Sequence, residues 1–245
     1  MSIFHLSSNQ LSAKRPSQAI GSLSAALLLV AASLSSAQAQ QVLSPEQTSQ
    51  AARQVIQERL VEAVQLYSDD ELVRLIRNNE HFARVRDTDD CQLYQDIRAQ
   101  AEIERRPVYQ LLYGDMLAYS VCYERDVKLG VTYMERAAAQ GMPEALEQMG
   151  RYYHQGRFVQ QDNRRALLYL REAAALGNLA AQKRFADLLL AGQGSPLDYE
   201  AAYHYLHNAV TADRTEHQAI SKRLNQLAEL LPPRIVERAK SPLDA

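Results

Sequence analysis

The 245-residue chain contains no tryptophan, only four phenylalanines and no surplus of basic residues. Its 27 lysines and arginines are outnumbered by 29 aspartates and glutamates, giving a formal net charge of −2. A chain without a basic excess lacks the charge that neutralises a phosphate backbone, so we expect no nucleic-acid partner. Tyrosine, with 13 copies, is predicted to supply most of the aromatic packing.

Long hydrophobic runs are also scarce, since the main one, Ile20 to Ala32, is short for a membrane span. Lys14 and Arg15 precede it and Ala37-Gln38-Ala39 follows it, as in a secretory signal peptide cleaved after Ala39. We predict that residues 1–39 are a signal peptide, and a retained anchor is the alternative. No later stretch is apolar enough to span a bilayer, and the residue directly after the cleavage site is Gln40 and not a cysteine, so we expect no membrane insertion and no lipid anchor.

A repeat of 36 residues is the most informative pattern, because units that begin at Pro107, Pro143 and Leu179 align without gaps. A constant period of this length is typical of solenoids, in which each unit buries its apolar face against its neighbours. We predict three units, residues 107–142, 143–178 and 179–213. The recurring residues include Gly114 and Gly150; Asp126, Asp162 and Asp198; Tyr133, Tyr169 and Tyr205; and Ala137, Ala173 and Ala209.

Each unit is predicted to be a helix hairpin. In the middle unit, Pro143 suits the first turn of a helix, and Gly156 suits its end. Asp162 suits the N-cap of a second helix, which Gly177 ends. The first helix would bury Leu146, Met149, Gly150 and Tyr153, and the second Ala166, Leu167, Tyr169, Leu170, Ala173 and Ala174.

The flanking regions lack the repeat and are predicted to cap the stack. Residues 40–106 form an N-terminal helical cap region, and residues 214–245 form a C-terminal cap and tail. The expected fold is therefore an all-α solenoid of helix hairpins with helical caps. The helical stretches expected in the caps are Pro45–Leu66 (with Ser44 and Gln47 as a capping box), Asp69–Asn78, Asp90–Ile103, His217–Leu231 and a tail from Arg234.

Residues that could support catalysis or bind a cofactor are not evident. Gly192-Gln193-Gly194 occupies a repeat turn and lacks the lysine of a phosphate loop, so we interpret it as a turn. His204 and His207 have helical spacing that could hold a metal, but variable residues occupy the equivalent repeat positions. The three recurring aspartates are better explained as N-caps. We therefore predict no catalytic residue, no metal and no cofactor.

Cys91 and Cys122 are the two cysteines of a chain predicted to be exported, and an oxidising compartment favours their pairing. The repeat places Phe158 and Gly194 where unit one has Cys122, so the fold alone does not require cysteine there. We predict a disulfide between them. By closing a loop of the unfolded chain, it would stabilise the folded protein by roughly 3–4 kcal/mol. Two buried free thiols are the alternative.

Solenoids of helix hairpins usually bind proteins along the first helix of each unit. Side chains there that point away from the predicted packing side are candidates for binding, although a merely solvated face is the alternative. They are Asp115 and Tyr119 in unit one, Glu147, Arg151 and His154 in unit two, and Lys183 and Asp187 in unit three.

The segment Ala145–Gly177 resembles the Sel1-like subclass of tetratricopeptide-type repeats. Other segments resemble the MotX-like proteins of sodium-driven polar flagellar motors, and this resemblance covers roughly residues 67–240. The segments that carry it are Asp90–Leu93, Tyr109–Ala118, Cys122–Val127, Gly194–Glu200 and Asn208–Asp213.

The resemblance implies a non-catalytic periplasmic scaffold of the basal body, in the T-ring, that helps to recruit stator units for rotation. The implied partners are a MotY-like T-ring protein and the periplasmic part of the stator's B subunit. One alternative is a secreted hydrolase of the β-lactamase-like Sel1 type, but those proteins carry a cysteine pair in every repeat and units two and three here carry none. The other is a general envelope adaptor.

Overall fold

The computed structural model describes Glu46, Ser49, Gln50 and residues 67–242. The chain divides into two compact units, residues 1–51 and 52–245, and the fold below is that of the second. The predicted signal peptide, the capping box at Ser44 and nearly all of the helix predicted over 45–66 lie outside the described residues.

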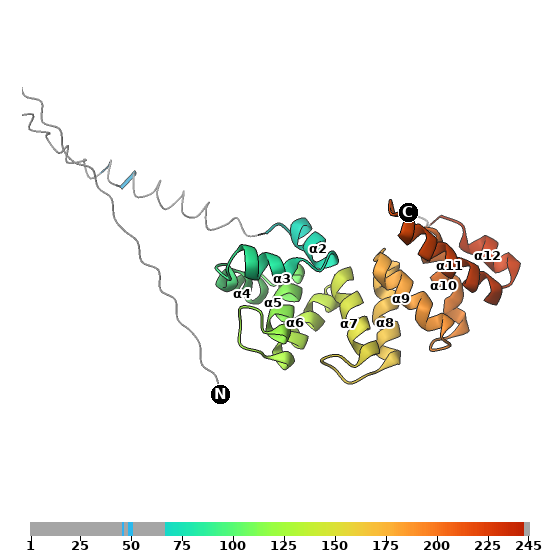
Figure 1. The fold of residues 1–245 in the computed structure, drawn as a ribbon, viewed down its shortest axis with the longest axis horizontal. Coiled ribbons are helices and arrows are strands. Elements are labelled where there is room, and N and C mark those ends of the chain that lie inside the picture. The colour runs from blue at the N-terminus through green and yellow to red at the C-terminus, as the bar shows by residue number, and fades with distance from the viewer. Residues whose placement is uncertain (1–45, 47–48, 51–66, 243–245) are drawn as a thin grey trace, which may run out of the picture. The chain divides into compact units, whose positions relative to one another are not determined.

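Helices and the turns between them make up the whole described part of the second unit, so the all-α prediction is confirmed (Figure 1). The three predicted repeat units contain the helix pairs α5–α6, α7–α8 and α9–α10. The helices are α2 Asp69–Arg77, α3 His81–Ala83, a π-helical turn at Arg84–Thr88, α4 Tyr94–Glu102, α5 Pro107–Tyr119, α6 Val127–Ala139, α7 Pro143–Gln155, α8 Asn163–Ala175, α9 Leu179–Leu190, a 3-10 turn at Pro196–Asp198, α10 Tyr199–His207, α11 Arg214–Leu230 and α12 Pro233–Ala239.

Local sequence signals determine where the hairpin helices begin and end. Pro107 and Pro143 occupy the first helical positions of α5 and α7, where the missing backbone N–H costs nothing. Gly156 ends α7 in the left-handed conformation that glycine adopts most easily. At the equivalent place α5 ends at Ser120, which takes up the same conformation without being glycine.

The prediction of three aspartate N-caps is right for two units and wrong for the third. The Asp126 carboxylate accepts a hydrogen bond from the Leu129 amide, and Asp162 accepts one from Arg165. Asp198 makes no such bond, because the 3-10 turn runs directly into α10 and leaves Asp198 in a helical conformation. Its carboxylate instead lies 3.2 Å from the Arg171 guanidinium.

Replacing these aspartates with alanine should therefore have unequal effects. Asp126→Ala and Asp162→Ala each lose a cap and should lower the free energy of unfolding by about 1 kcal/mol. Asp198→Ala loses only an ion pair with a largely exposed partner and should cost less than about 0.5 kcal/mol. Urea unfolding followed by circular dichroism measures all three, and equal losses would contradict the distinction.

Small residues allow the two helices of a hairpin to pack closely. A Cβ atom added to Gly114 of α5 would lie 2.6 Å from the carbonyl oxygen of Gly130 on α6, and one added to Gly130 would lie 2.6 Å from that of Gly114. In the second unit, a Cβ atom on Gly150 would meet the Leu170 side chain. The hydrophobic core runs through the stack between the helices, and tyrosines provide much of its aromatic part, including fully buried Tyr109 and Tyr152.

The N-terminal cap differs in part from the prediction. The helix expected from Asp90 starts only at Tyr94, because Asp90 and Cys91 have φ values of 47° and 57°, outside the right-handed helical region. The helical segment His81–Thr88 was not predicted at all.

The turn before α4 is joined to the turn between α5 and α6. Cys91 and Cys122 form a disulfide, with Cα atoms 5.6 Å apart and a sequence separation of 31. Close to this bridge in sequence, the ring of Tyr94, the first residue of α4, makes an edge contact with the ring of Tyr123.

At the C-terminal end, α11 packs on α9 and α10, and α12 packs on α10. Leu227 is fully buried, and Leu224 and Leu231 are partly buried and pack against the core. Across the described residues, none of the helices combines the length and the apolar character that crossing a membrane requires.

Candidate protein-binding site

The seven residues predicted to bind proteins lie on α5, α7 and α9, but the structure gives them different roles. Asp115 is the clearest error, because only 2% of its surface is exposed. Its carboxylate accepts a hydrogen bond from the Gln148 amide of α7 and lies 3.5 Å from Nε2 of His81. The cap helix α2 packs against both α5 and α7, and α3 brings His81 onto Asp115. The repeat pattern does not predict the burial of Asp115, because the helices that cover it, α2 and α3, lie outside the repeats.

Tyr119 packs between units one and two. Its hydroxyl is 2.8 Å from that of Tyr152, and its ring contacts Phe82 and Phe158. Burial raises the pKa of Tyr152 far above the ordinary tyrosine value, so this hydroxyl stays protonated and can donate the shared hydrogen bond. The side chain of Tyr119 is partly buried and therefore stabilises the stack.

Charged side chains link the first helices of units two and three to each other and to the cap helices α2 and α11, and we call these contacts the ion-pair ladder. Arg184 on α9 donates to Glu147 on α7 over 2.7 Å. Arg223 on α11 donates through two nitrogens to the carboxylate of Asp187 on α9, each over 2.8 Å. The remaining contacts of the ladder are Lys183 with Glu216 and, at the N-terminal cap, Arg77 with Glu144.

The ladder changes the interpretation of three predicted binding residues. Glu147, Lys183 and Asp187 each have a charged partner on a neighbouring helix, so part of their function is to join the units. The sequence analysis did not predict these ion pairs, because the partners Arg184, Glu216 and Arg223 lie 33 to 37 residues away.

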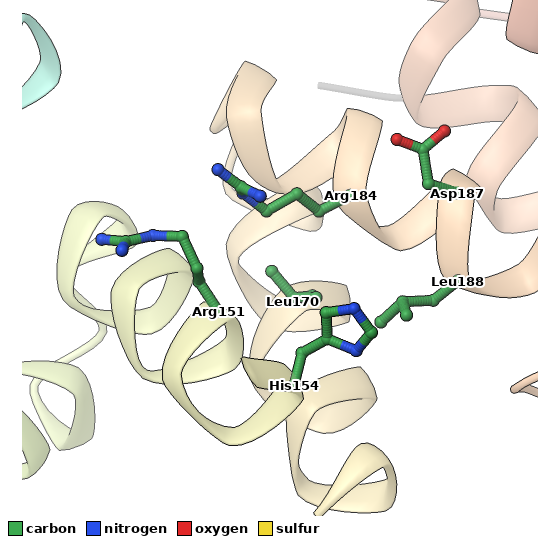
Figure 2. Close-up of a pocket in the computed structure, with 6 residues that line it drawn as sticks. All are labelled: Arg151, His154, Leu170, Arg184, Asp187 and Leu188. Carbon is green, nitrogen blue, oxygen red and sulfur yellow. The ribbon is translucent and has the colours of Figure 1, made fainter. Parts of the chain in front are cut away.

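A pocket with a volume of about 130 Å³ opens between α7 and α9, above α8 (Figure 2). It brings together three predicted residues, Arg151, His154 and Asp187, and three that were not predicted to bind. The unpredicted residues are Leu170, Arg184 and Leu188. Leu170 and Leu188 are buried, so they form an apolar base beneath the charged groups.

Arg151 keeps its charge at this pocket. Burial alone would lower the pKa of its guanidinium, but the nearby Glu147 carboxylate raises it, and the net result is a pKa above the ordinary arginine value. Its Nε atom lies 3.5 Å from Glu147, the same carboxylate that Arg184 contacts. The pocket therefore has two guanidinium groups that share one carboxylate.

The two histidines considered as metal ligands make other contacts. Nδ1 of His204 lies 3.0 Å from the carbonyl oxygen of Ala239, which helps to fix α12, and the His207 ring stacks on Tyr203. Within the described residues, no three of the residues His, Cys, Asp and Glu are grouped so that they could hold a metal ion.

Comparison with known proteins identifies the family to which the chain belongs. The Sel1 repeat matches residues 107–142, 143–178 and 179–213. The sodium-type polar flagellar protein MotX of Vibrio parahaemolyticus serotype O3:K6 (strain RIMD 2210633) is 54% identical over 177 residues, which are 72% of this chain and 83% of that protein. The chain belongs to the MotX family.

Two solved structures are also similar to this member of the MotX family. A Sel1 repeat protein from Oxalobacter formigenes has a TM-score of 0.42 at 18% identity, over 59% of this chain and 56% of its own. A protective antigen of uropathogenic Escherichia coli with an SLR fold has a TM-score of 0.37 at 23% identity, over 58% of this chain and 34% of its own. The chain thus spans about half or less of these two proteins.

Proposed function

We propose that this chain is a non-catalytic component of the polar flagellar motor, located in the periplasm as part of the T-ring of the basal body. There it binds a MotY-like protein and the periplasmic part of the stator's B subunit, and so helps to recruit the stator units that turn the motor. The observation that carries the proposal is the 54% identity to a sodium-type polar flagellar MotX over 72% of the chain.

The geometry supports binding in preference to catalysis. Among the described residues, His81 lies 3.5 Å from Asp115, a pairing that could support catalysis, but only 4% and 2% of their surfaces are exposed, so the pair is closed to a substrate. The accessible charged residues on the first helices lie instead along the ion-pair ladder. A row of helices whose positions are fixed by such contacts presents a preformed surface, which reduces the entropy lost when a partner binds.

Deleting the gene should leave flagella assembled but not rotating. A scaffold that recruits stators is needed for torque, whereas filament assembly does not depend on torque. Electron microscopy should show filaments of normal number, and tethered cells should not turn. Expression of the intact chain in trans should restore swimming, and a deletion strain that lacks filaments or swims normally would contradict the proposal. With purified components, we expect the chain to sediment with basal bodies only when a MotY-like protein is present.

A further inference from the structure

The pocket between α7 and α9 has an excess of positive charge. Arg151 and Arg184 contribute two guanidinium groups and contact a single carboxylate, that of Glu147. Asp187 also lines the pocket, but both of its oxygens accept hydrogen bonds from Arg223 of α11, so its charge is already compensated. One positive charge is left for a group that enters from outside.

The rest of the pocket suits an aliphatic chain. Figure 2 shows the imidazole of His154 lying between Leu170 and Leu188, with Arg184 across from them. Nδ1 of His154 lies 3.3 Å from the side-chain amide oxygen of Asn163, and this contact orients the ring. Nε2 of His154 has no hydrogen-bond partner among the described residues. The two leucines and the two arginines thus line one small cavity.

The size of the cavity limits what it can hold. A water molecule occupies roughly 30 Å³ in the liquid, so a volume of about 130 Å³ has room for one side chain and not for a packed helix or strand. A glutamate places a carboxylate at the end of two methylene groups, which matches a cationic wall above an apolar base. A guanidinium donates to a carboxylate through two parallel N–H groups, so the match includes geometry as well as charge.

We propose that this pocket is a docking site for one acidic side chain, that of a glutamate, in a segment of a protein partner. The assignment to a motor partner rests on the function proposed above. The binding chemistry does not, because it depends only on Arg151, Arg184 and the leucine base. The pocket would therefore supply specificity at one point of a larger contact surface.

The test uses two short probes with the purified protein. N-acetyl-Glu-amide carries the proposed carboxylate, and N-acetyl-Gln-amide replaces it with an uncharged amide of nearly the same shape. The ring signals of His154, assigned with the variant His154→Gln, report occupancy by NMR. The signals of His81, His204, His207 and His217 serve as internal references.

We expect the glutamate probe to shift the His154 signals in a saturable way and the glutamine probe to bind about tenfold more weakly. Arg184→Gln should weaken the glutamate probe by a similar factor. Arg238→Gln is the matched control, because Arg238 pairs with Glu200 between α12 and α10, away from the pocket, and it should leave binding unchanged. Equal binding of the two probes to the unaltered protein, or no saturable shift, would overturn the docking site whether or not any variant folds.

A second measurement connects the pocket to the motor. In the deletion strain, the Arg184→Gln protein should restore swimming to less than roughly half of the rate given by the Arg238→Gln protein at equal protein levels. Equal swimming would overturn the assignment of the pocket to a motor partner. Normal swimming of the deletion strain itself would overturn the proposed function and leave the comparison of the two probes standing.

Discussion

Gly114→Ala should lower the free energy of unfolding by about 3 kcal/mol. The added Cβ atom would lie 2.6 Å from the carbonyl oxygen of Gly130 and 3.1 Å from the backbone nitrogen of Met134, so α5 and α6 must move apart. Alanine is the better helix former by roughly 1 kcal/mol, but this gain is smaller than the cost of separating two backbones. Denaturant unfolding followed by far-ultraviolet circular dichroism measures the loss.

Gly150→Ala is the matched control because it occupies the same repeat position. Here the added Cβ atom would lie 2.6 Å from Cγ of Leu170, a side chain that can move, while the nearest backbone atom is the Ala166 carbonyl oxygen at 3.2 Å. The gain in helix propensity then offsets most of the strain, and we expect a loss below about 1 kcal/mol. The third unit has Ala186 at this position, buried in the core. Equal losses at Gly114 and Gly150 would show that the backbone contact is not what matters.

Cys91→Ser and Cys122→Ser should each lower the free energy of unfolding by roughly 3–4 kcal/mol, because either change opens the covalent loop. The bridge joins the N-terminal cap to the first repeat turn. A terminal unit of a stack has one neighbour only, so the cap and unit one should lose protection first. Hydrogen exchange can locate this loss in α4 and α5.

The double variant is the control for this prediction. Both single changes remove the same bond, so the double change should cost little more than either one. Mass spectrometry of the alkylated, unreduced protein tests the bridge directly, and two alkylated cysteines would refute it. Additive losses in the double variant would show that each side chain acts through its own packing.

Individual aspartates show which features could not be predicted from the sequence. Asp126, Asp162 and Asp198 share one repeat position, yet only the first two accept an amide hydrogen bond. The exception arises from the 3-10 turn Pro196–Asp198, which leaves Asp198 in a helical conformation although α10 starts at the same repeat position as α6 and α8. Asp115 was predicted to face a partner and is buried, because helices from outside the repeat cover it.

The sequence by itself determined the period, the helix pairs and most helix ends, since proline, glycine and capping side chains act on backbone atoms within about four residues. Only the tertiary structure decided which charges are satisfied inside the protein and which remain for a partner. Arg184, Arg223 and Glu216 find their partners 33 to 37 residues away. Such pairing depends on how the units stack, so the pocket with its two arginines and one carboxylate exists only after the stack has formed.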